Sequence, residues 1–220
     1  MDDPDTSVAD YKRCLHDLAT VNRITFTHGP TLRWLGKATR GLPKGSHLSV
    51  LDVGCGEGDL LRAIEKWANK KGFVALLDGI DLNPRSATTA IAATPPNSSI
   101  TYLTGNVFDF EPVPVPDFIV SSQFTHHLAD DEIPRFLGWQ ERHAGRGWFI
   151  ADLHRRLMPY FGFRVLCVLA GWHRIVRLDG TISIARSFRV ADWIGYLGKV
   201  GLTAYIRREF PFRLCVGRLK

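Results

Sequence analysis

The sequence predicts an α/β fold: one doubly wound, mostly parallel sheet of seven strands that ends in an antiparallel C-terminal hairpin. From about residue 46, short runs rich in β-branched residues alternate with helical runs. Such alternation implies parallel strands joined by right-handed crossovers. A glycine-rich turn follows the first of these strands. The last two strand-like runs, 202–210 and 212–218, meet at Pro211 with no helix between them, which predicts the hairpin.

The predicted elements follow in order along the chain. Residues 48–53 form the first strand, and 59–69 form a helix because one face gathers its apolar side chains: Leu60, Leu61, Ile64, Trp67 and Ala68. The second strand ends at Asp81, and Asn83 with Pro84 opens the next helix, since proline suits a first helical turn. The remaining elements are strands at 100–103, 117–121 and 148–151 and helices at 130–143 and 190–200.

Two segments fall outside this α/β core of a single domain, residues 1–220. We expect residues 1–45 to form an N-terminal helical lid, and 155–176 to form a helical insertion after the fifth strand. Both can cover the carboxyl ends of the strands, where such sheets bind ligands. The apolar stretch 157–172, which includes Phe161, is expected to be a wall of the substrate pocket, although a membrane-surface contact or a homodimer face stays open. The stretch is too short to span a bilayer, so no stable membrane insertion is expected.

Composition narrows the function without deciding it. The net charge is +6, but the arginines of the last third are spread out, which favours a solvated surface over a nucleic-acid site. The four cysteines lie far apart and predict neither a disulfide framework nor a zinc site. The N-terminus is acidic, unlike a signal peptide, so a cytoplasmic location is expected.

The sharpest signal is D-V-G-C-G-E-G at residues 52–58, at the exit of the first strand. Alternate glycines let the backbone turn tightly and let a ligand approach the main chain. A dinucleotide fingerprint would need its third glycine at 59, where Asp59 stands, and the lysine of a phosphate-binding loop is absent. A purely structural turn would lose much backbone entropy for no functional reason.

This turn resembles the first motif of the class I S-adenosylmethionine-dependent methyltransferases, D-x-G-x-G-x-G. The resemblance covers about residues 46–152 and implies S-adenosylmethionine as the cofactor. It implies that the methionine end of the cofactor is held by Asp52, Gly54, Cys55 and Gly56.

Two further strand ends continue the resemblance. Asp81, followed by Leu82, is suited to accept hydrogen bonds from both ribose hydroxyls, although Asp78 is a rival and helix capping is an alternative role. The family has an acidic residue that meets the adenine amino group where this chain has Asn106, and the backbone of the next residue, Val107, would meet the ring. An amide carbonyl can also accept from an amino group.

The resemblance places the fourth strand end beside the methyl donor, with the backbone of Ser121 and Gln123 near the cofactor's amine. A positioned histidine could take the proton of a phenol as the methyl transfers. His126, His127 and His154 are the candidates, and we expect only one of the first two to face the site because neighbours on an extended segment point in opposite directions.

The form Q-F-T-H-H-L at 123–128 resembles the branch that methylates small molecules, including quinones and polyketide-type phenols. The predicted function is therefore methyl transfer to a small aromatic acceptor, with a phenolic hydroxyl favoured. Arg155 could bind an anionic group of the acceptor or lie on the surface. The acidic residues 130–132 are expected in the first turn of a helix for dipole reasons, so no metal is predicted.

Two other functions stay open. A nucleic-acid methyltransferase would carry an (N/D)-P-P-(Y/F) segment after the fourth strand, where this chain has S-S-Q-F, so no nucleic-acid partner is expected. A non-catalytic S-adenosylmethionine-binding protein would keep the binding site without turnover.

Overall fold

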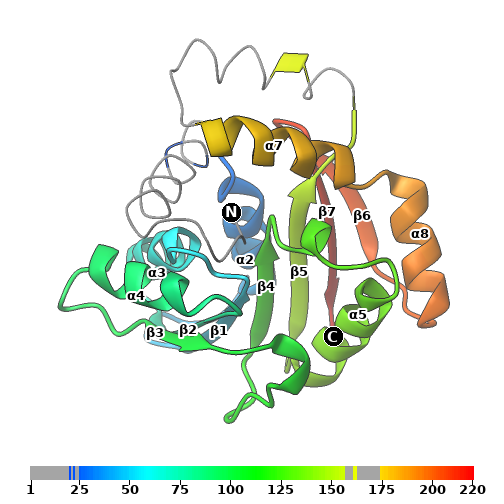
Figure 1. Ribbon diagram of the computed structural model, residues 1–220. Coiled ribbons are helices and arrows are strands. Elements are labelled where there is room, and N and C mark those ends of the chain that lie inside the picture. The colour runs from blue at the N-terminus through cyan, green and yellow to red at the C-terminus, as the bar shows by residue number, and fades with distance from the viewer. Residues whose placement is uncertain (1–19, 21, 23–24, 157–160, 163–173) are drawn as a thin grey trace.

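The computed structural model describes residues 20, 22, 25–156, 161–162 and 174–220 (Figure 1). Within them lies a seven-stranded sheet with the order β3-β2-β1-β4-β5-β7-β6. Its strands are β1 (His47–Val53), β2 (Val74–Asp81), β3 (Thr101–Thr104), β4 (Phe118–Ser122), β5 (Gly147–Leu153), β6 (Tyr205–Glu209) and β7 (Arg213–Leu219). Strands β1 to β5 pair in parallel, whereas β7 runs antiparallel to both β5 and β6. The predicted fold class and its C-terminal hairpin are confirmed.

The strand order reverses at β1. This strand pairs with β2 on one side and with β4 on the other, so Val53 lies between Ile80 and Ser121. The chain therefore winds outward from β1 in two opposite directions. Open α/β sheets bind their ligands at the carboxyl ends of the strands at such a point.

The helices begin and end for local reasons. Helix α3 (Asp59–Lys71) buries its apolar face and ends at Gly72, whose left-handed backbone (φ +78°) returns its N–H to the last turn. Helix α4 (Pro84–Ala93) begins after Asn83, whose side chain accepts a hydrogen bond from the backbone N–H of Arg85. Helices α2 (Gly29–Ala38), α5 (Glu132–His143) and α8 (Val190–Lys199) complete the layers.

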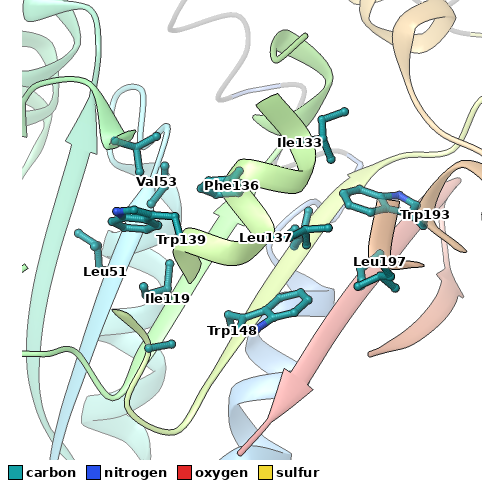
Figure 2. Packing of buried hydrophobic residues seen from close by; sticks show 14 of the residues in the cluster. Leu51, Val53, Ile119, Ile133, Phe136, Leu137, Trp139, Trp148, Trp193 and Leu197 are labelled. Carbon is teal, nitrogen blue, oxygen red and sulfur yellow. The ribbon is translucent and has the colours of Figure 1, made fainter. Parts of the chain in front are cut away.

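The core lies on both faces of the sheet, because alternate residues of each strand point to opposite sides. Phe118 and Val120 of β4 pack with α2 and α3, while Ile119 between them packs with α5 and α8. Figure 2 shows the cluster that contains Ile119, in which Trp148 of β5 lies beneath helices α5 and α8. Burial on both faces leaves the strand ends as the place for a polar site.

Helix α7 (Arg174–Arg186) extends beyond the predicted insertion, which ended at residue 176. Its sequence is poor in strong helix formers, so tertiary contact outweighs propensity here. The helix packs on the turn η2 (Thr125–His127), and the backbone of Phe188 after it bonds to Leu153 and Arg155. Helix α7 thus lies across the carboxyl end of β5 (Figure 1). Residues 1–19, 157–160 and 163–173 of the two predicted lid segments lie outside the described residues.

None of the described helices is both long enough and apolar enough to cross a bilayer.

Candidate active site

The glycine turn after β1 has three left-handed residues, with φ of +72° at Gly54, +52° at Gly56 and +74° at Gly58. A Cβ on Gly54 would lie 2.5 Å from the ring of Phe124, and one on Gly58 would overlap Tyr102. A Cβ on Gly56 would meet nothing within 4 Å. Packing therefore requires two of the glycines, whereas Gly56 borders open space that a ligand can occupy.

Asp81 stands at the end of β2 and faces this turn. Its Oδ2 accepts a hydrogen bond from the backbone N–H of Gly56 at 2.9 Å, and its Oδ1 accepts one from the N–H of Asn83 at 2.9 Å. The rival Asp78 lies earlier on β2, where it pairs in register with Thr101 of β3. Of the two carboxylates, the structure brings Asp81 to the glycine turn.

Two neighbours of these residues differ in exposure. The side chain of Leu82, which directly follows β2, is 73% exposed. Cys55 is buried in the core cluster beneath α2 and α3, and its burial, followed by the nearby Asp52 and Asp81, raises the pKa of its thiol. Leu82 therefore offers an apolar surface to a ligand, whereas Cys55 is kept as an unreactive thiol.

Three carboxylates gather around the glycine turn. Asp52 is only 2% exposed, and its Oδ1 has no hydrogen-bond partner among the described residues. Its burial, and then the neighbouring Asp59 and Asp81, raise the pKa of Asp52 well above its usual value. A buried acid without a partner is unfavourable by itself, and a bound cation would relieve it.

The N-terminal segment reaches this turn through polar contacts. Asn22 donates from Nδ2 to Asp59 at 2.9 Å and accepts at Oδ1 from Nε2 of Gln123 at 2.6 Å. Nε2 of His28 lies 3.1 Å from the same Asp59 carboxylate. Burial alone would raise the pKa of Asp59, but the bonds from His28 and Asn22 and the charge of Arg62 hold it below its usual value. Residues 21, 23 and 24 of the predicted N-terminal lid lie outside the described residues.

The exit of β4 has a strained, polar backbone. Gln123 has a left-handed φ of +55°, which is uncommon for a residue with a side chain, and its N–H donates to the carbonyl of Ala151. The hydroxyls of Ser121 and Ser122 are buried without a hydrogen-bond partner among the described residues. Strain and unpaired polar atoms of this kind concentrate at functional sites.

The segment after β3 carries the predicted adenine contacts. Asn106 is exposed, and its Oδ1 accepts a hydrogen bond from the N–H of Phe108 at 3.1 Å, which caps the short turn η1 (Val107–Asp109). Val107 is buried in the core. A carbonyl oxygen has two lone pairs, so capping leaves Asn106 able to accept a second hydrogen bond.

The adjacent histidines after β4 differ from the expectation. Residues 125–127 form a 3₁₀ turn rather than an extended segment, so the two rings lie 4.3 Å apart instead of on opposite sides. His126 is buried, and its Nδ1 lies 2.7 Å from Oδ1 of Asp152 at the end of β5. His127 is exposed. The argument from alternation was wrong because a turn replaces the strand at this point.

Asp152 is the residue that sequence reasoning missed. It is fully buried, and Thr125 donates to its Oδ2 at 2.5 Å, as does the backbone N–H of His126 at 3.1 Å. Burial would raise its pKa, but the charge and hydrogen bond of His126 and the bond from Thr125 hold the pKa of Asp152 below its usual value. One signal in the sequence could have found it. Asp152 lies at the end of β5, and the neighbouring strand β4 is followed by His126.

The two predicted residues that follow β5 lie in different surroundings. His154 is buried, and its N–H donates to the carbonyl of Phe212; burial, then Arg156 and Arg208, lower the pKa of its ring. Arg155 donates from Nη2 to Asp192 of α8 at 2.8 Å. One amino group of the Arg155 guanidinium thus binds a carboxylate of the protein, and a role for Arg155 in binding an anionic acceptor stays a prediction.

The remaining predicted features lie away from the glycine turn in the sequence. Phe161 is exposed, while its neighbours in sequence at 157–160 and 163–173 lie outside the described residues. Asp130 accepts from the hydroxyl of Tyr196, and Glu132 accepts from the N–H of Ala129. In the part of the chain that is described, no group of three or more His, Cys, Asp or Glu residues is arranged to hold a metal ion.

The sheet, with its antiparallel seventh strand, has the fold of the solved methyltransferase structures described below. Residues 50–147 match the family described as "Methyltransferase domain". This part of the chain is therefore similar to the methyltransferases, in agreement with its glycine turn. No curated protein sequence matches the chain.

Solved structures share the fold at low identity. The plantazolicin methyltransferase BpumL in complex with SAH has a TM-score of 0.72 and 16% identity, covering 100% of this chain and 91% of that one. Human N-acetylserotonin methyltransferase in complex with SAM has a TM-score of 0.66 and 14% identity, over 97% and 56%. Magnesium protoporphyrin IX methyltransferase from Synechocystis PCC 6803 with bound SAH has a TM-score of 0.56 and 18% identity, over 89% and 82%.

Proposed function

We propose that this protein transfers a methyl group from S-adenosylmethionine to a small aromatic acceptor, and that the methylated group is a phenolic hydroxyl. The methyltransferase domain supports the reaction, and the solved structures of the same fold contain SAM or SAH, which supports the same methyl donor here. Their names describe small-molecule acceptors, which favours that class of substrate.

The residues at the carboxyl end of β1, where the strand order reverses, fit this cofactor. Open space at Gly56 leaves room beside the main chain, and the buried carboxylate of Asp52, whose Oδ1 has no partner among the described residues, suits a ligand with net positive charge. Asp81 would hold the ribose hydroxyls, in exchange for its present bond to Gly56, and Leu82 would cover an apolar ring. Asn106 and Val107 would meet the adenine, and the backbone at Ser121 and Gln123 would meet the amine.

The pair formed by His126 and Asp152 carries the proposal of a general base. Asp152 accepts the proton on Nδ1 of His126, which fixes the ring and leaves Nε2 as the atom that can take a proton. His127 is exposed and His154 lies beside two arginines, whereas His126 is buried against a carboxylate. Of the three predicted histidines, we therefore assign the base to His126.

This arrangement is sufficient for the chemistry. S-adenosylmethionine, when bound, supplies a methyl group that its sulfonium already activates, so the protein must align the acceptor and exclude water. A phenol has a pKa near ~10, and its proton must leave as the oxygen is methylated. His126 would take that proton while the buried Asp152 carboxylate stabilises the imidazolium that results.

Calorimetric titration tests the cofactor. Wild type should bind S-adenosylmethionine and S-adenosylhomocysteine, and Asp81→Ala should lose most of that affinity. Asp78→Ala is the matched control, because it removes a carboxylate from the same strand away from the glycine turn. Absence of binding to wild type, or equal losses in the two variants, would contradict the proposed site.

A transfer assay tests the acceptor. The purified protein should move a labelled methyl group from S-adenosylmethionine to phenols or hydroquinones, and the O-methyl ether should be identified by mass spectrometry. Matched anilines and carboxylic acids serve as competing acceptors. Methylation of nitrogen, carbon or a carboxylate in preference to the phenol would keep the methyltransferase and overturn the acceptor.

A further inference from the structure

Two exposed phenylalanines lie at the site end of the sheet. Phe26 is 68% exposed and sits at a left-handed turn (φ +50°), while Phe210 is 79% exposed in the turn that precedes β7. Thr25 and Thr27, on either side of Phe26, accept hydrogen bonds from Arg213, the first residue of β7. The two aromatic rings are thus carried by turns that are tied to each other.

The turns lie beside the carboxyl end of β5. The carbonyl of Phe212, in the same turn as Phe210, accepts from the N–H of His154 just after β5. Strand β5 ends and β7 begins at the same end of the sheet, beneath α7 (Figure 1). We call this surface the aromatic rim. It consists of Phe26 and Phe210 together with Arg33, Arg156, Arg207 and Arg208.

The aromatic rim is positively charged. Arg33 and Arg207 share one carboxylate, that of Glu209. Arg156 and Arg208 are exposed, both lie near His154, and neither forms an ion pair with a carboxylate of the described residues. Residues 25–51, which include α2, contain no Asp or Glu. A surface with more arginines than carboxylates attracts an anionic surface.

Apolar tips within a basic rim match the surface of a lipid bilayer. Single exposed phenylalanines are common and need no explanation. Two on adjoining turns, with basic side chains around them, have the composition of interfacial anchors, in which aromatic rings enter the headgroup region and arginines bind anionic lipids. A nucleic acid is less suited, because the rings lie on separate turns rather than along a groove that could stack successive bases.

We infer that the aromatic rim docks the protein on the surface of an anionic membrane. Docking through Phe26 and Phe210 turns the carboxyl end of the sheet toward the bilayer. A lipophilic acceptor could then enter the site directly from the membrane. This last step rests on the proposed function, whereas the docking does not.

Vesicle sedimentation tests the docking without any use of activity. The full chain should sediment with phosphatidylcholine vesicles that contain phosphatidylglycerol, and much less with phosphatidylcholine alone. Phe26→Asn, which suits the left-handed backbone, and Phe210→Ser should each lower the partition coefficient by about tenfold. Arg208→Glu should weaken binding in proportion to the anionic lipid content.

Ile194→Ser is the matched control, since Ile194 is 61% exposed on α8, outside the rim, and its loss should leave binding unchanged. Circular dichroism and thermal melting verify that each variant is folded. Three outcomes would overturn the inference: no sedimentation of the wild type, equal binding by the Phe and Ile variants, or stronger binding to duplex DNA that the Phe variants retain. A protein that docks but transfers no methyl group would contradict the proposed function alone.

Discussion

Nδ1 of His126 lies 2.7 Å from Oδ1 of Asp152, and both side chains are buried where strands β4 and β5 end. A histidine in this position has one nitrogen committed to a carboxylate. The carboxylate also accepts from Thr125 and two backbone N–H groups, so its own position is fixed. The ring is thereby held in one orientation, which a general base requires.

His126→Asn should lower kcat by about 10²- to 10⁴-fold, because the amide can still donate to Asp152 but cannot accept the acceptor's proton. The loss should be greatest at low pH, where fewer phenol molecules ionise without help. Steady-state kinetics from about pH 6 to about pH 9 measure it. His127→Asn, which alters the exposed neighbour, should change kcat only slightly. A larger effect at His127 would transfer the role of base to that residue.

Asp52→Asn should change how stability depends on pH. Burial and the neighbouring Asp59 and Asp81 raise the pKa of Asp52 above its unfolded value, near ~3.9. Protonated Asp52 therefore stabilises the folded state. This contribution to stability is fully present below the unfolded pKa and is lost as pH rises through the folded pKa. The wild type should lose unfolding free energy over this range, and the asparagine variant should lose less. Urea denaturation at several pH values measures both.

Asp152→Asn is the control of opposite sign. The pKa of Asp152 is lowered, so its contribution is present above the unfolded pKa and disappears only in acid. This variant should be less stable than the wild type at neutral pH and converge with it as pH falls. If Asp52→Asn were less stable than the wild type at neutral pH, the prediction would be contradicted. The Asp52 carboxylate would then have a stabilising partner in solution.

Sequence alone could predict the unit from β1 through the glycine turn to α3, because its signals are local. The apolar period defines the strand and helix, and the three glycines lie within one turn. The His126–Asp152 pair could not be predicted in the same way. It depends on the register that places Ser122 beside Ala151 and on a 3₁₀ turn that the pattern of side chains does not mark. The partner of Arg155 could not be predicted for a related reason, since Asp192 lies on a helix distant in the sequence.

Gly56→Ala should separate ligand binding from stability. Gly56 has a left-handed backbone with nothing within 4 Å of the position that an added methyl group would take, so alanine costs about 1 kcal/mol of conformational strain without a clash. Gly45→Ala is matched, because Gly45 has φ +84° and equally open space away from the site. Both variants should lose similar stability in urea. Only Gly56→Ala should weaken S-adenosylmethionine binding, by tenfold or more. Equal binding by both variants would exclude Gly56 from the cofactor-binding site.

Thr27→Val should destabilise the protein by about 1–3 kcal/mol, because it removes an acceptor from a buried charge. Nη2 of Arg213 donates to the Thr27 hydroxyl at 2.6 Å, and burial lowers the pKa of this guanidinium to about 10. Thr88→Val is the control, since Thr88 is exposed on α4 and makes only a long bond to Pro84. Urea denaturation compares the two, and hydrogen exchange should show faster opening of residues 25–30 in Thr27→Val alone. Equal stability of the two variants would mean that the turn is held by contacts other than Arg213.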